Sequence, residues 1–112
     1  MMANPPESLT VKREARILAV DFGAGRCYDL PFEYLRVYSP SAEVRGHGPG
    51  QGSLPRGKDK VTIVRIEPVG HYAVRLIFDD GHDSGLYTWA YLDELGRNKV
   101  DNWQAYLDRL KA

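Results

Sequence analysis

The stretch Val61–Phe78, VTIVRIEPVGHYAVRLIF, decides how this chain folds. Its first half, up to Val69, is apolar on both faces, which is typical of a central strand. Pro68 marks the end of that strand, because proline lacks the N–H that a sheet needs. After a turn at Gly70-His71, apolar and polar residues alternate as far as Phe78, as in a strand with one buried face. The two strands are expected to form the heart of an antiparallel sheet.

Further strands and one helix are expected before this pair. The strands are predicted at residues 9–12, 17–22 and 27–30. The turn Gly23-Ala24-Gly25 joins the last two as a hairpin. Pro31 suits the first position of a helix, where its missing N–H costs nothing. That helix is expected to end at Ser39-Pro40, since a residue before proline avoids helical geometry.

The part after Phe78 predicts a hairpin and two helices. Asp79-Asp80-Gly81 is a strong hairpin signal. Thr88 suits the N-cap of a short helix that ends at Gly96, and a last helix is expected to start near Asp101 or Asn102. No internal repeat and no regular strand-helix alternation is present. The fold class expected is therefore α+β, a mainly antiparallel sheet with one inserted helix and two C-terminal helices.

Length and composition predict one intracellular domain. The 112 residues leave room for one core, which we place at 9–112 after a flexible lead at 1–8. Basic and acidic residues both number 15, so the overall charge attracts neither nucleic acid nor anionic membranes. The one cysteine, Cys27, excludes an internal disulfide and is expected to be a buried structural thiol. Without an apolar run of about 20 residues or a signal peptide, a cytoplasmic location is expected.

A glycine-rich loop is expected from Ser39 to Gly57, which holds five of the 11 glycines. Loops of this length are usually either functional or mobile, and the residues leave both alternatives open. The loop lacks the Gly-Lys-Ser or Gly-Lys-Thr of a P-loop and a helix start after it. We therefore interpret the basic residues in and just after this loop as a solvated rim rather than an anion site: Arg45, Arg56, Lys58 and Lys60.

Two histidines, His47 and His82, lie in polar surroundings beside glycine, and three aspartates surround the second. Such a mixed cluster can bind a metal, but the chain has no Cys-x-x-Cys spacing of a closed zinc site. The competing interpretation is a histidine hydrogen-bonded within a turn. No Gly-x-Ser-x-Gly elbow presents a serine nucleophile. No catalytic set is predicted, and the chain is expected not to be an enzyme.

Two segments resemble a known family. They are residues 35–48, LRVYSPSAEVRGHG, and residues 78–85, FDDGHDSG, followed by Tyr87 and Trp89. Together they resemble the N-terminal domain of gamma-butyrobetaine hydroxylase in a short, free-standing bacterial form, over about Leu9 to Leu95. The jelly-roll domain that binds iron and 2-oxoglutarate in the full-length hydroxylases has no counterpart here. Its His-x-Asp motif is also missing, since Asp83 directly follows His82, and hydroxylase activity is not inferred.

The resemblance also implies a zinc site held by three cysteines and one histidine. The histidine corresponds to His82, whereas the cysteine positions correspond to Ser39, Ser41 and Val44. Serine hydroxyls replace thiolates poorly as zinc ligands, so this zinc site is expected to be lost. No cofactor is therefore expected, and a bound zinc or iron ion is the alternative. Similar domains are appended to Mrp-type ATPases that carry iron-sulfur clusters, which implies an accessory role near iron or iron-sulfur proteins.

The function expected is a non-catalytic binding or accessory module. Its partner is predicted to be a protein, and its surface is predicted to combine the Ser39–Gly57 loop with the Asp79–Gly85 turn. The residues assigned to this surface are Arg45, His47, Asp80, His82 and Asp83. The alternative is a small metal-binding protein or metal-dependent enzyme that uses His82 and nearby carboxylates. The oligomeric state is not indicated by the sequence.

Overall fold

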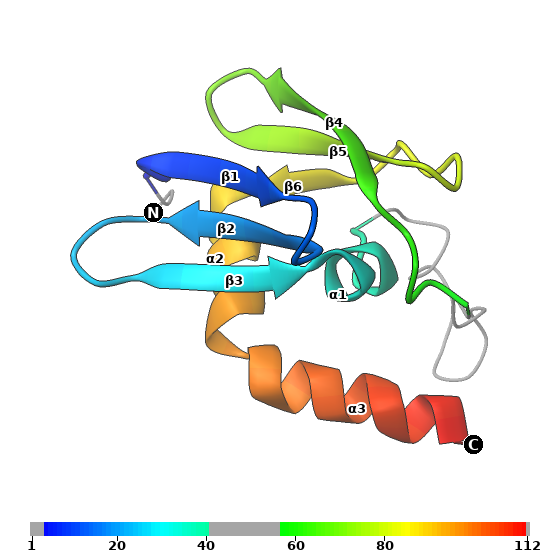
Figure 1. Ribbon diagram of the computed structural model, residues 1–112. Helices are drawn as coiled ribbons and strands as arrows, with labels where there is room; N and C mark the ends of the chain where they lie inside the picture. The colour runs from blue at the N-terminus through cyan, green and yellow to red at the C-terminus, as the bar shows by residue number, and fades with distance from the viewer. Residues whose placement is uncertain (1–3, 41–56, 112) are drawn as a thin grey trace.

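The computed structural model describes residues 4–40 and 57–111, and it confirms the α+β class with antiparallel sheets (Figure 1). The first sheet has the order β1-β2-β3, with β1 at Ser8–Lys12, β2 at Ile17–Asp21 and β3 at Cys27–Pro31. The second has the order β4-β5-β6, with β4 at Ile63–Val69, β5 at Ala73–Phe78 and β6 at Leu86–Thr88. One helix follows β3 and two close the chain: α1 at Phe32–Val37, α2 at Trp89–Arg97 and α3 at Lys99–Lys111.

Both sheets share one hydrophobic core. Alternation places one face of each strand inward, as Leu18 and Val20 do on β2. On β5 the predicted alternation is confirmed for Val74, Leu76 and Phe78, which are all buried, but Tyr72, expected on the same face, precedes the strand and is exposed. Helices α1 and α2 add buried residues to the same cluster: Phe32, Tyr34, Leu35, Leu92 and Leu95. Burial of a large apolar side chain contributes roughly 1.5–3 kcal/mol, so this shared cluster is the main source of stability.

Strand β4 lies at an edge, and the prediction that it is a central strand is wrong. An irregularity between Ile63 and Arg65 takes Val64 out of the core, leaving it 50% exposed. Pro68 lies within the strand opposite Val74, a position that an edge tolerates. At the beginning of the strand, Arg13 Nη1 donates to the Ile63 carbonyl at 2.5 Å. The middle position belongs to β5.

The helix boundaries follow local signals at their beginnings more closely than at their ends. Pro31 is the N-cap of α1 and the last residue of β3, one position earlier than predicted. Thr88 caps α2 as predicted, with its Oγ1 accepting from the Tyr91 N–H at 3.1 Å. Gly96 does not end α2, since the helix continues to Arg97. A Cβ at Gly96 would lie 2.3 Å from Cγ of Tyr28, so the glycine serves close packing rather than termination.

The prediction of a buried Cys27 is also wrong. Cys27 is exposed, because Tyr28 and Leu30 take the inward positions of β3. A hydrogen bond with Asp21 is the first cause that raises the pKa of the Cys27 thiol, followed by desolvation and the neighbouring carboxylates. The thiol is therefore not activated as a nucleophile.

The last helix, α3, begins at Lys99, two residues before the predicted start. It lies along α1 and β3 (Figure 1), and Tyr106 on it donates to Glu33 Oε2 at 2.6 Å. None of the helices in 4–40 and 57–111 is long and apolar enough to cross a membrane.

Candidate functional site

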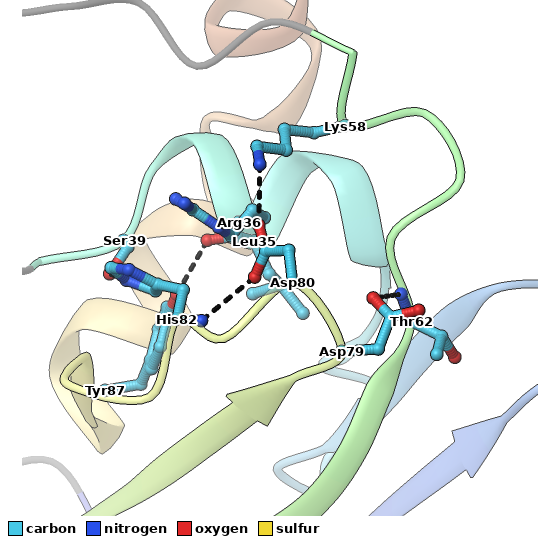
Figure 2. A network of polar contacts seen from close by, with 9 residues as sticks. All are labelled: Leu35, Arg36, Ser39, Lys58, Thr62, Asp79, Asp80, His82 and Tyr87. Atoms are coloured by element: carbon cyan, nitrogen blue, oxygen red, sulfur yellow. Dashed lines mark hydrogen bonds and ion pairs between the residues drawn. The ribbon is translucent and has the colours of Figure 1, made fainter.

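The turn at residues 79–85 joins β5 to β6 beside the end of α1 (Figure 2). The Phe78 N–H donates to the His82 carbonyl at 3.0 Å, and Gly81 adopts φ +92°, a conformation that favours glycine. Asp79 ties the turn to the chain before β4, since its N–H donates to the Thr62 carbonyl at 3.0 Å. The hairpin expected at Asp79-Asp80-Gly81 is confirmed by the antiparallel pairing of β5 and β6.

Asp80 is the charged centre of the turn. Its Oδ2 lies 2.8 Å from Arg36 Nε and 2.8 Å from Lys58 Nζ, and its Oδ1 accepts from the His82 N–H at 3.0 Å (Figure 2). Burial raises the pKa of this carboxyl, but hydrogen bonds from Lys58, His82 and Arg36 outweigh it and hold the pKa well below its ordinary value. The carboxylate is thus ionised at neutral pH and held by three donors.

Ser39, the second residue after α1, contacts the same turn. Its Oγ lies 2.8 Å from Nε2 of His82, and the residue is only 3% exposed. Buried Tyr87 lies beside Ser39 next to Gly85. Tyr87 in turn donates to the Leu35 carbonyl at 2.6 Å. Burial raises the pKa of Tyr87 well above its ordinary value, and the neighbouring Ser39 hydroxyl opposes this.

Gly85 permits this close arrangement. A Cβ at this position would lie 2.6 Å from Ser39 Oγ and 3.0 Å from Cε1 of Tyr87. The first contact is shorter than real Cβ atoms show and the second is tighter than most of them, so a larger residue would displace the serine or the ring. The absence of a side chain at residue 85 therefore belongs to the site.

The turn holds residues from both sides of the glycine-rich segment. Ser39 is the first residue of that segment and binds His82, whereas Lys58 directly follows it and binds Asp80. These partners are far apart in the chain, with 43 positions between Ser39 and His82. Only the tertiary fold brings them together.

The structure places some of the sequence-predicted residues and not others. Ser39 and His82 are in contact, Asp80 lies inside the polar network, and Asp83 is exposed. The remaining assigned residues, Ser41, Arg45 and His47, and the zinc-site position Val44 lie outside the described residues.

Sequence reasoning missed Arg36 and Tyr87 as members of the site and treated Lys58 as part of a solvated rim. Arg36 lies on α1 and Tyr87 on β6, and both contact the turn through long-range bonds. Neither residue belongs to a motif with a known chemistry. The one local signal was Gly85 next to Leu86-Tyr87, which is compatible with a close approach of two segments.

The described residues do not fit the closed zinc site that the family resemblance implies. Ser39 Oγ and His82 Nε2 are hydrogen-bonded to each other, and a serine hydroxyl is a poor zinc ligand. Asp80 is bound by two cations. Within 4–40 and 57–111, no group of three or more histidine, cysteine, aspartate and glutamate residues is placed to hold a metal ion.

Comparisons with solved structures agree over most of the chain. An NMR solution structure with 50% identity has a TM-score of 0.81 and covers 96% of this chain and 80% of that one. Another NMR structure with 46% identity has a TM-score of 0.83, covering 98% and 86%. A crystal structure from Acidithiobacillus ferrooxidans, described as a protein with unknown function of the DUF971 family, is 38% identical with a TM-score of 0.68, covering 81% and 91%.

Sequence comparisons give the family. No curated protein matches the chain. The family model described as gamma-butyrobetaine hydroxylase-like, N-terminal, matches residues 9–93, which include α1, both sheets apart from Ser8, and the whole 79–85 turn. The chain therefore belongs to the family of gamma-butyrobetaine hydroxylase-like N-terminal domains.

Proposed function

We propose that this protein is a non-catalytic binding module that meets a protein partner through the 79–85 turn and the segment between Ser39 and Lys58. The observation that carries the proposal is the attachment of both flanks of this segment to one turn. His82 holds Ser39 at 2.8 Å, and Asp80 holds Lys58 at 2.8 Å. These two contacts fix the positions at which the segment between Ser39 and Lys58 leaves and re-enters the fold. Binding loops are commonly positioned by a rigid scaffold in this way.

The chemistry of the turn supports binding rather than catalysis. The Asp80 carboxylate is neutralised by Arg36 and Lys58, which suits a structural ion pair better than a general base. Ser39 is buried and bonded to His82, so its hydroxyl is not presented to a substrate. Asp83 is exposed on the same turn and is available to a partner.

A protein is the partner class that the charges favour. With 15 basic and 15 acidic residues, the chain offers no overall attraction to nucleic acid. The family resemblance makes iron and iron-sulfur proteins the first partners to test. This part of the proposal rests on the resemblance alone.

Site-directed photo-crosslinking in the native host tests the proposal. One version of the chain carries a photo-crosslinking amino acid at Asp83, and the matched control carries it at Ala105, an exposed position on α3. Crosslinked proteins are identified by mass spectrometry. We expect one protein to be enriched at position 83 over position 105.

A second arm tests the frame itself. Asp80→Asn in the position-83 version should lower the crosslinked yield several-fold, because the two flanks of the segment lose a common anchor. Equal crosslinking yields at positions 83 and 105 would contradict the proposal. So would a crosslinking yield at position 83 that Asp80→Asn leaves unchanged.

A further inference from the structure

Helix α3 lies along α1 and β3 but contributes little to the shared core (Figure 1). Among residues 99–111 Tyr106 is the one that is buried, and Val100 near the beginning is 79% exposed. Tyr106 does not belong to the hydrophobic cluster that α1, α2 and both sheets share, and the partly buried Trp103 packs only against its outside. The family match ends at residue 93, before α3 begins.

Hydrogen bonds attach α3 to α1. Nδ2 of Asn102 donates to the Tyr34 hydroxyl at 3.1 Å, and the Asn102 carbonyl accepts from the Tyr38 hydroxyl at 2.8 Å. One turn further along, Tyr106 donates to Glu33 Oε2 at 2.6 Å. Two successive turns of α3 are thus bound to α1. We call the group of Asn102, Tyr34 and Tyr38 the α3 clasp.

A carbonyl sets the direction of the bond between Asn102 and Tyr34. Tyr34 donates its one hydroxyl proton to the Leu95 carbonyl at 2.7 Å, and a carbonyl only accepts. The Tyr34 oxygen is therefore an acceptor toward α3, and the Asn102 amide supplies the hydrogen. An ionised aspartate is of similar size but has no hydrogen to donate. The clasp thus requires an amide at residue 102.

The clasp lies next to the candidate site. Tyr38 directly precedes Ser39, where the segment to Lys58 leaves the fold. The carbonyl of Tyr38 also accepts from the Tyr91 hydroxyl of α2 at 2.6 Å. Tyr38 is therefore held by α3 through its hydroxyl and by α2 through its carbonyl, and removal of α3 leaves one of these two attachments.

We propose that α3 is a hinged cover, which opens away from α1 as a unit when the clasp breaks and thereby loosens the chain at Ser39. Asn98, the single residue between α2 and α3, departs from helical geometry and is the hinge. Elements with little buried apolar surface open at a lower free energy than the core. Asn102 is then a positioning residue. The opening is a property of the chain alone, whereas control of partner binding by α3 rests on the proposed function.

Hydrogen exchange of the full chain without a partner tests the opening. After correction for intrinsic rates, we expect α3 amides to exchange at least about tenfold faster than β5 amides. Urea should accelerate the exchange of α3 less, because its opening exposes less surface. Equal opening free energies and equal urea dependence in α3 and β5 would overturn the proposal, since the chain would then open as one unit.

Three variants of α3 test the clasp. Asn102→Ala removes the donor to Tyr34 and should raise exchange in α3 about fivefold. Asn102→Asp should raise it as well at neutral pH, because the carboxylate donates no hydrogen. The matched control, Gln104→Ala, loses a bond to Asp108 within α3 and should change exchange by no more than about twofold. If Asn102→Asp exchanges like the natural chain, or Asn102→Ala like the control, the clasp does not hold α3.

Thiol labelling tests the link between α3 and the candidate site. Ser39→Cys in a Cys27→Ser chain places the one thiol at a position that is 3% exposed. In this background Asn102→Ala should speed labelling about fivefold, and Gln104→Ala should change it by no more than about twofold. Equal labelling rates in the two variants would show that α3 does not control the chain at Ser39. Each measurement uses the chain alone, so a failure here is distinct from a failure to find the proposed protein partner.

Discussion

Asp80 and Asp93 stand at the centre of two similar polar clusters in different surroundings. Asp80 binds Arg36 and Lys58, whose side chains are 13% and 24% exposed. Asp93 binds Arg26 and Arg97, whose side chains are 52% and 58% exposed. The aspartates themselves are almost equally shielded, at 18% and 16%. The difference lies in how much water reaches their cations.

The lower exposure of the cations around Asp80 indicates which cluster contributes more to the stability of the fold. Charges that lie away from water interact more strongly and leave a larger penalty when one partner is lost. The Asp80 cluster also joins α1, the chain before β4 and the 79–85 turn, whereas Asp93 ties α2 to β3 and to its own next turn. We therefore expect the Asp80 cluster to carry more of the stability.

Asp80→Asn should give the largest effect. The asparagine amide would bring a donor toward Arg36 and Lys58, leaving two partly buried cations without their anion. We expect a loss of about 2–3 kcal/mol in the free energy of unfolding. Urea denaturation measures it, with Asp93→Asn as the matched control. Equal losses in the two variants would show that partner burial does not separate the clusters.

Acid should remove the Asp80 contribution in a defined direction. Its folded-state pKa lies below the ordinary value, so the unfolded chain takes up the proton first as the pH falls. The contribution is complete above the ordinary pKa of about 4 and is lost progressively below it. The stability difference between the natural chain and Asp80→Asn should thus hold from about pH 7 to 5 and shrink toward pH 2. A difference that grows on acidification would contradict this sign.

Gly96→Ala tests the packing beside the Asp93 cluster. Alanine favours helix over glycine by about 1 kcal/mol, but here the methyl group would lie 2.3 Å from Cγ of Tyr28. The ring must move and lose its 2.9 Å bond to Asp93, so we expect a net loss of about 1–2 kcal/mol. In a Tyr28→Ala background the same change should become stabilising. Thermal unfolding of the four variants checks this reversal of sign.

Added salt should give the smallest change in stability, and it should affect the Asp80 and Asp93 clusters differently. Asp93→Asn is expected to cost less than about 1 kcal/mol, because its arginines are largely exposed. At about 1 M salt, where screening acts within about 3 Å, that cost should disappear while most of the Asp80→Asn cost remains. Chemical denaturation at low and high salt measures both. If the stability cost of Asp80→Asn disappeared completely at high salt, the Asp80 cluster would behave as an ordinary surface ion pair.

Local patterns predicted most elements of the fold but not their places in it. The alternation of Val74, Leu76 and Phe78 identified β5 and its buried face, and Thr88 identified the beginning of α2. The position of β4 was predicted wrongly because an apolar run shows which residues prefer burial, not which strand lies beside which. The prediction that Gly96 ends α2 was wrong for a similar reason, since the Tyr28 ring that requires a glycine there belongs to β3.

The candidate site was foreseen in part. The segment motifs pointed to Ser39 and His82, which the structure brings into contact. Arg36, Lys58 and Tyr87 could not be assigned, because their roles depend on distances across the fold rather than on spacing in the chain. Ser41, Arg45 and His47 lie outside the described residues, and their assignment to a partner surface stays a prediction.

The sequence by itself determined the α+β class, the start of α2, the family and the segment in which the site lies, because these depend on residue periodicity, caps and short motifs. Tertiary structure alone decided that Asp80 meets Arg36, 44 positions away, that His82 meets Ser39, and that Tyr87 meets the Leu35 carbonyl. The physical reason is that a polar side chain is satisfied by whichever partner the packed core brings within hydrogen-bond distance. That distance is set by the sheets and helices as a whole.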